Sequence, residues 1–342
     1  MRRTPLLLAL AALGLALVSP ELLARTRRGA SKSFSKAAES ALPSLIAPPS
    51  ASPRDLLVAE ACRRGLGDAA GSVVAMDPWT GRVLAVVNPR DGLARAYTPC
   101  SVFKIVVAIA GLSEGIVTPE TTYNCNGGCW TWPGHGPISL RRALAVSCNP
   151  YFEWIGGRLG YGQIQRYAQL LGLGAPSGIN VTGESGGVLP GFVRPDRVPH
   201  MSSHAKGIAT SALQLAVLLS ATVNGGVVYQ PQVAGPEGFV PKERWRLPPA
   251  TVLQGLGEGF LAAVNEGSAS LAFDAEIPVA GKTGSCAHVG WFASYAPADQ
   301  PEIVVVVLLR GSNGHRASAV AGRIYQDVFR YPAGTPAAAG GH

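Results

Sequence analysis

The chain has 342 residues, of which 47% are hydrophobic and 15% charged, with 42 glycines and 27 prolines. This composition is too apolar for an intrinsically disordered protein, and the chain is too long for a disulfide-stabilised miniprotein. The formal net charge is +8, but seven basic and two acidic side chains place most of it in the first 50 residues, so nucleic-acid binding is not expected.

The N-terminal segment has the layout of an export signal. Two arginines precede an apolar run from Leu6 to Val18, which is shorter than the ~18 residues that cross a membrane as a helix. Ala24 suits a cleavage site, whereas Leu22 does not. We expect residues 1–24 to be a signal peptide or a membrane anchor in contact with anionic lipid. The rest should be exported, to the periplasm or the extracytoplasmic face of the inner membrane.

One globular domain is expected after this segment. Residues 25–52 are rich in Ser, Ala, Pro and Arg and predict a flexible linker. The low-complexity tail at 332–342 predicts disorder. No second linker or internal repeat lies between them, so the folded domain should span residues 53–331.

Strand patterns occur at both ends of this domain. The runs Gly71–Met76 and Arg82–Val87 flank turn residues and predict a β-hairpin. Late in the chain, Val289–Tyr295 and Glu302–Leu309 have strand patterns, and Ala317–Phe329 has helical spacing. The middle is mostly helical. We therefore expect an α+β fold, in which an antiparallel sheet formed from both ends of the chain has flanking helices and an inserted all-helical lobe.

A serine at the start of the helical region is the first candidate for chemistry. Thr98 is an N-cap residue type and Pro99 suits the first helical position, so a helix should begin here. Ser101 then lies in the first turn, with Lys104 on the same face and able to accept the hydroxyl proton. The spacing alone is weak evidence, because Ser33 to Lys36 in the linker has it too.

Six cysteines in an exported chain permit disulfide bonds. Cys125 and Cys129 flank an Asn-Gly-Gly turn, and we expect a disulfide between them that holds the Trp130 region beside a cleft. Zinc is the alternative, but His135 is a single further ligand where two are needed. We expect no metal and no cofactor.

A second polar pair lies between two helices. Residues 139–146 predict one helix, and Asn149 and Pro150 cap another. In the extended joint, Ser147 and Asn149 project to the same side. They can present a hydroxyl and an amide to a cleft, although capping alone would also explain both residues.

The third element is Lys282-Thr283-Gly284-Ser285 in a strand-like run. Gly284 lacks a side chain where a substrate backbone could pair with the strand, and Lys282 with the two hydroxyls could bind a carboxylate. Strand alternation places Lys282 and Thr283 on opposite faces. The sequence leaves open which of them faces the cleft.

The three motifs in this order are far more specific than any one alone. Ser-x-x-Lys, Ser-x-Asn and Lys-Thr-Gly form the active-site set of serine acyl-transferases that act on D-Ala-D-Ala peptides and β-lactams. The chain resembles the transpeptidase domain of class B penicillin-binding proteins. Its Gly134-His135-Gly136 and Ser147-Cys148-Asn149 sequences are most similar to elongation-type members.

This resemblance implies a serine D,D-transpeptidase that acts on peptidoglycan stem peptides and is acylated by β-lactam antibiotics. Ser101 would be the acylated nucleophile and Lys104 its base. Ser147 would pass the proton to the leaving nitrogen, and Asn149 would contact the substrate amide.

The resemblance assigns substrate binding to the late strand. Lys282 would supply positive charge, while Thr283 and Ser285 would receive the substrate carboxylate. The backbone N–H groups of Ser101 and Ser285 would form the oxyanion hole. A lysine acts as a base only when it is desolvated and near a second cation, which Lys282 beside Lys104 would provide.

Two features depart from the family pattern. Class B members carry a large N-terminal non-catalytic domain, which the short segment before the first hairpin does not match. The segment between Gly284 and Trp291 is short, which predicts a tight turn where the family often has a longer loop, and substrate preference could shift accordingly.

Three other functions stay open. A class D β-lactamase fits the residues around Ser101, but that family has Ser-x-Val and Tyr-Gly-Asn motifs, whereas here the second motif is Ser-x-Asn and Tyr161-Gly162 precedes Gln163. Glu184 is expected to be structural rather than a deacylating base. A D,D-carboxypeptidase would use water as acceptor, and a β-lactam sensor would acylate once and signal.

Overall fold

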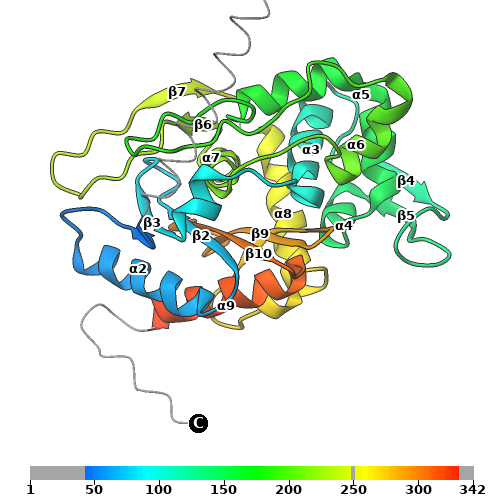
Figure 1. Ribbon diagram of the computed structural model, residues 1–342. Coiled ribbons are helices and arrows are strands. Elements are labelled where there is room, and N and C mark those ends of the chain that lie inside the picture. Colours follow the sequence, from blue (N-terminus) through cyan, green and yellow to red (C-terminus); the bar gives the residue numbers. More distant parts are fainter. Residues whose placement is uncertain (1–42, 248–250, 331–342) are drawn as a thin grey trace, which may run out of the picture. The chain divides into compact units, whose positions relative to one another are not determined.

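The computed structural model describes residues 43–247 and 251–330. The expected α+β fold is confirmed, because one antiparallel sheet draws its strands from both ends of the domain, in the order β1-β3-β2-β10-β9-β8 (Figure 1). The strands are β1 (Leu45–Ile46), β2 (Gly71–Met76), β3 (Val83–Val87), β8 (Ala280–Cys286), β9 (Val289–Ala296) and β10 (Ile303–Arg310).

Two terminal helices cover one face of the sheet. α2 (Pro53–Leu66) and α9 (Gly314–Arg330) pack against each other and against the central strands. A capping box starts α2, since Ser52 Oγ accepts the Asp55 N–H and the Asp55 carboxylate accepts the Ser52 N–H. The predicted hairpin is present as β2 paired with β3, the two late strand runs pair as β9 and β10, and the late helix is α9.

The run of apolar residues in β10 reflects burial on both sides. Val304 and Val306 belong to the core under the helical lobe, whereas Val305 and Val307 belong to the core under α2 and α9. A strand covered on both faces has no polar alternation, so helices must occupy each side of the sheet.

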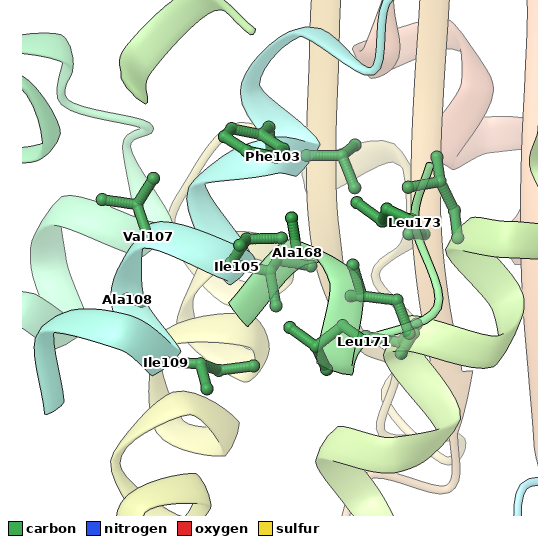
Figure 2. Packing of buried hydrophobic residues seen from close by; sticks show 14 of the residues in the cluster. Phe103, Ile105, Val107, Ala108, Ile109, Ala168, Leu171 and Leu173 are labelled. Atoms are coloured by element: carbon green, nitrogen blue, oxygen red, sulfur yellow. The ribbon is translucent and has the colours of Figure 1, made fainter. Parts of the chain in front are cut away.

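The lobe inserted between β3 and β8 contains most of the helices. They are α3 (Lys104–Ser113), α4 (Leu140–Ala145), α5 (Asn149–Leu170), α6 (Val198–His204), α7 (Ala212–Val223) and α8 (Thr251–Asn265), with short turns at Arg90–Ala94, Cys100–Phe103, Pro195–Arg197 and Ser270–Ala272. Figure 2 shows Ile105 and Ile109 of α3 packed near Ala168 and Leu171 at the end of α5.

The expectation of an all-helical lobe is wrong in one respect. Two small antiparallel sheets lie within it, β4 (Thr122–Cys125) with β5 (Gly136–Ser139) and β6 (Val227–Tyr229) with β7 (Glu243–Arg246). Strands of three or four residues carry too little periodic signal to be found in the sequence.

The expected linker at 25–52 ends earlier than predicted. Leu45 and Ile46 form β1, which pairs with Val87 and Val86 of β3 and extends the sheet by one strand. The signal or anchor at 1–24 and the tail at 332–342 lie outside the described residues. Among the described helices, none combines the length and the hydropathy that a membrane crossing requires.

Candidate active site

Ser101 and Lys104 are brought to the same side by a tight turn. Cys100–Phe103 is a 3₁₀ helix that continues into α3 at Lys104. Side chains three residues apart eclipse each other in a 3₁₀ helix, so both functional groups face the same way, as expected. Thr98 is not the N-cap, which is a correction: Pro99 precedes the turn and no side chain caps it.

The turn is attached to the late strands by two bonds. Cys100 forms a disulfide with Cys286 at the end of β8. The buried Trp291 of β9 donates its indole N–H to Thr98 O at 2.9 Å. These contacts fix the position of Ser101 relative to the sheet.

Lys104 is fully buried and its amine is directed at the second motif. Its Nζ lies 2.8 Å from Ser147 O, 3.1 Å from Ser147 Oγ and 2.6 Å from Asn149 Oδ1. Burial lowers the pKa of Lys104 to about 7. The amine can therefore be neutral at physiological pH and accept a proton. The Ser147 hydroxyl is close enough to pass a proton to or from this amine.

Ser147 has a left-handed backbone, with φ of 56°, in the joint between α4 and α5. Such a conformation is uncommon for a serine and is held here by the helices on each side. Capping does not explain this pair: Cys148 is the N-cap of α5, and Asn149 is its first residue. The side chains of Ser147 and Asn149 instead form hydrogen bonds with the Lys104 amine.

The Lys-Thr-Gly motif lies on β8, at the opposite wall of the same cavity. Thr283 Oγ1 is 2.7 Å from Ser268 Oγ, and Ser285 Oγ accepts the Gly314 N–H at 2.8 Å. Thr283 and Ser285 both line the cavity. Thr283, not Lys282, therefore faces the cleft.

Gly284 has a different role from the one expected. A Cβ atom at this position would lie 2.7 Å from Pro99 O, a distance that real Cβ contacts do not reach. The glycine lets β8 approach the turn that carries Ser101. Its missing side chain makes room for the protein's own backbone rather than for a substrate.

Lys282 is fully buried and donates from Nζ to Thr283 O at 3.0 Å. Burial, with the charge of Lys104 as a second cause, holds the pKa of Lys282 well below its usual range. These surroundings favour a neutral amine over the cation that the resemblance implies. The low pKa of Lys104 is due to its own burial, not to Lys282.

One cavity of about 530 Å³ brings the motif residues together. The complete lining is Ser101, Trp130, Arg142, Val146, Ser147, Asn149, His204, Glu266, Gly267, Ser268, Thr283, Ser285 and His315. His204, Ser268 and His315 could not be found from the sequence, because each reaches the cavity from a segment without a motif.

Two candidate carboxylates, Glu184 and Glu266, are engaged in other contacts. Glu266 Oε1 lies 2.6 Å from Arg141 Nη2, and Glu266 Oε2 lies 3.4 Å from Arg142 Nη1. Glu184 accepts the backbone N–H groups of Ser177 and Gly178 at 2.6 and 3.1 Å, as its expected structural role requires. Neither carboxylate is placed as a free base.

Cys125 and Cys129 are free thiols, so the expected disulfide between them is wrong. Cys148 Sγ lies 3.5 Å from Cys125 Sγ and 4.0 Å from Cys129 Sγ, while His135 Nδ1 lies 3.6 Å from Cys125 Sγ. Trp130 is held by its indole N–H donating to Val146 O at 2.9 Å.

The side chains of Cys125, Cys129, His135 and Cys148 can together bind a metal ion. Their ligand atoms all lie within 4.8 Å of one another, and three sulfurs with one imidazole nitrogen match a set that zinc takes in structural sites. Among the described residues, His135 Nε2 is buried without a hydrogen-bond partner. Cys148, from the second motif, supplies the ligand that local sequence around Cys125 and Cys129 lacks, so the ligand set for zinc is complete.

Comparisons with known proteins identify the family of the chain. The family model described as "Penicillin binding protein transpeptidase domain" matches residues 71–330. The chain is 28% identical to Stage V sporulation protein D of Bacillus subtilis, over 70% of this chain and 45% of that protein. It is 27% identical to Peptidoglycan D,D-transpeptidase MrdA of Haemophilus influenzae, over 73% of this chain and 51% of that protein. The chain thus spans about half the length of these relatives.

Solved structures share the fold. A D,D-transpeptidase domain from Eggerthella lenta superimposes with a TM-score of 0.71 at 20% identity, covering 80% of this chain and 81% of that one. Penicillin-binding protein A from M. tuberculosis, solved as an imipenem acyl-enzyme complex, gives a TM-score of 0.69 at 21% identity, covering 81% and 78%. With the family model covering the chain from β2 to α9 and all three motifs, the chain belongs to the penicillin-binding protein transpeptidase domain family.

Proposed function

We propose that the chain is a serine D,D-transpeptidase that acts on the D-Ala-D-Ala stem peptides of peptidoglycan and is acylated by β-lactams. One observation carries the proposal: the buried Lys104 amine, with a pKa of about 7, contacts Ser147 and Asn149 in the cavity that Ser101 and Thr283 also line. The relatives named above, including a D,D-transpeptidase, support it.

The first half-reaction follows from these positions. Neutral Lys104 takes the Ser101 hydroxyl proton as Oγ attacks the peptide carbonyl. In the structure, the Lys104 amine forms hydrogen bonds with Ser147 and Asn149. The hydrogen bond from Ser101 to this amine should form when substrate binds, because catalytic hydrogen bonds tighten in the complex. Ser147 Oγ, 3.1 Å from Nζ, then delivers a proton to the leaving nitrogen. The D-alanine departs and the acyl group stays on Ser101.

The substrate carboxylate is proposed to bind at β8. Thr283 and Ser285 present hydroxyls into the cavity, and Arg142 and His315 add basic side chains to its wall. A carboxylate here would draw a proton to the buried Lys282 amine, because an opposite charge nearby favours the ammonium form. Lys282 would then be charged in the complex and neutral without substrate.

The site of action is proposed from the substrate and from the N-terminal sequence. Peptidoglycan lies outside the cytoplasm, so the domain should be exported and work in the periplasm or on the outer face of the inner membrane. The basic and apolar residues at 1–36 support membrane contact or export. The folded domain, which includes β1 (Leu45–Ile46) ahead of the start predicted at residue 53, would carry the chemistry.

Intact-mass analysis after incubation with a penicillin tests the proposal. We expect an adduct that persists for hours, because the carboxylates Glu184 and Glu266 are engaged elsewhere. Rapid loss of the adduct would assign a β-lactamase instead. Absence of any adduct would refute the acyl-enzyme. In a separate assay with a stem peptide, release of D-alanine without peptide joining would assign a carboxypeptidase. Labelling that survives Ser101→Ala would refute the nucleophile, and Ser33→Ala is the matched control.

A further inference from the structure

His204 forms part of the cavity wall without belonging to any of the three motifs. It is the last residue of α6 and lines the same cavity as Ser101, Ser147 and Asn149. The acylation steps described above do not use it.

A hydrogen-bonded chain fixes the protonation pattern of His204. The hydroxyl of the buried Ser203 donates to Glu153 Oε1 at 2.8 Å, and His204 Nδ1 lies 2.5 Å from Ser203 Oγ. A hydroxyl has one proton to donate, and the Glu153 carboxylate is a stronger acceptor than the other nearby candidate, His200 O at 3.1 Å. Ser203 Oγ must then accept from His204 Nδ1–H. The lone pair of His204 lies on Nε2.

The charges around His204 keep it neutral but able to take a proton. On α6, the His200 ring stacks on it with centroids 4.2 Å apart. Burial, then the His200 and Lys104 charges, lower the pKa of His204, while Glu153 on α5 opposes them. The Glu153 carboxylate Oε1 lies 3.9 Å from the Nδ1 atoms of both histidines. An imidazolium formed at His204 would have a counter-charge behind it.

The second half of acyl transfer needs two proton acceptors. An amine acceptor in water is an ammonium ion, which must lose one proton before it can attack and a second as the new amide forms. Reversal of the acylation path, through Ser147 and Lys104, accounts for one of these protons. The other can be removed by a base in the same cavity.

We propose that His204 is the base that removes the first proton from the ammonium acceptor, with Ser203 and Glu153 as positioning residues. The inference rests on the proposed transpeptidase function. The ammonium N–H bond breaks and the proton moves to His204 Nε2. The free amine attacks the acyl carbonyl, the C–N bond forms and the bond from carbon to Ser101 Oγ breaks. The second proton returns to Ser101 Oγ through Ser147 and Lys104, and His204 releases its proton to solvent.

A β-lactam adduct would not use this base. The leaving nitrogen of a penicillin stays tethered to the acyl group, so it remains where an acceptor would bind. The long-lived adduct expected above is therefore compatible with a functional His204.

The experiment compares two acceptors on one acyl-enzyme. The full chain is acylated with a thioester donor that ends in D-alanine, and the joined product is measured with D-alanine or hydroxylamine as acceptor at pH 7. D-Alanine arrives as an ammonium ion, whereas hydroxylamine is already neutral. His204→Ala should lower the D-alanine rate relative to the hydroxylamine rate by about 100-fold, the range of general-base catalysis. Arg194→Ala, at an exposed residue outside the cavity lining, should keep the wild-type ratio.

Glu153→Gln tests the positioning residues. Glutamine can still accept the Ser203 hydroxyl but carries no charge, so the pKa of His204 should fall. The acidic limb of the pH–rate profile with D-alanine should move to lower pH, and the maximal rate should fall because the base is weaker. A profile identical to wild type would remove Glu153 from the mechanism.

The outcomes separate this inference from the proposed function. If the wild-type chain forms no acyl-enzyme, the proposed function fails. If it does and His204→Ala keeps the wild-type acceptor ratio, only the role of His204 is refuted. Glu153, His200 and His204 could together bind a divalent cation. Loss of D-alanine transfer with EDTA in the Cys129→Ser chain, which lacks the complete thiol ligand set, would assign a metal to these three residues and overturn the base. Acylation by a penicillin serves as the folding control for each variant.

Discussion

Cys100 and Cys286 form a disulfide between the residue before Ser101 and the residue after Ser285, with Cα atoms 5.8 Å apart. The two cysteines are separated by 186 positions in the sequence. The bond therefore joins the turn of the proposed nucleophile to the strand of the Lys-Thr-Gly motif. It fixes the two walls of the cavity relative to each other.

Removing this bond should cost stability and acylation rate together. For a loop of this length, Cys100→Ser should lower the free energy of unfolding by about 2–5 kcal/mol, measured by denaturant unfolding. Penicillin acylation should slow as well, because Ser101 and β8 lose their covalent tie. Peptide mapping of the non-reduced, alkylated chain should recover the Cys100–Cys286 pair. Alkylation of both residues would contradict it, and Cys62→Ser is a control outside the cavity.

Lys104 should act as a base and not as a cation. Its pKa of about 7 lies below the usual lysine value because of burial, so the neutral fraction grows as pH rises through 7. The acylation rate with a penicillin should rise over the same interval. Lys104→Arg should lose acylation as fully as Lys104→Ala, because an arginine stays charged. Near wild-type acylation by the arginine variant would show that another group takes the proton.

The same burial has a consequence for stability. Between pH 7 and the lysine value of 10.5, the unfolded chain binds more protons at Lys104 than the folded chain does, so this residue makes stability rise with pH. Lys104→Met should remove that dependence and stabilise the inactive chain at pH 7 by about 1–4 kcal/mol. Urea unfolding at pH 7 and pH 9 measures both effects. A destabilised methionine variant at pH 7 would show that the Ser147 and Asn149 bonds outweigh burial.

Gly284→Ala tests the approach of β8 to the nucleophile turn. The new Cβ would meet Pro99 O at 2.7 Å, and backbone cannot move aside cheaply, so a loss of about 1–3 kcal/mol is expected, with slower acylation. Gly162→Ala in α5 is the matched control. A Cβ there meets nothing within 4 Å, and alanine should stabilise the helix by up to about 1 kcal/mol. Equal effects of the two substitutions would contradict the packing role of Gly284.

The thiol cluster should bind zinc. Thiols at Cys125, Cys129 and Cys148 lose their protons when a metal binds, so the chain purified with zinc should retain it on dialysis and melt at a lower temperature after chelation. Elemental analysis and melting curves measure this. Cys129→Ser should remove both effects, whereas Cys62→Ser should not. Zinc retention by Cys129→Ser would place the metal elsewhere.

The fold class and the three motifs can be predicted from the sequence alone. Strand patterns such as Glu302–Leu309 are local, because burial on one or both faces shapes each run of residues independently of the rest of the chain. The spacing of Ser101 and Lys104 is local too, since one helical turn decides which side chains share a face. These features needed no knowledge of distant contacts.

Contacts between residues that lie far apart in the sequence are known only from the tertiary structure. Cys148 completes a ligand set with Cys125, and Cys100 pairs with Cys286, because folding brings together residues that the sequence separates. His204 likewise reaches the cavity from a helix without a motif. The charge of Lys282 depends on burial that no local pattern reveals. Cysteine pairings, burial and the lining of a cavity each depend on residues from distant parts of the sequence. They are therefore defined only once the chain is folded.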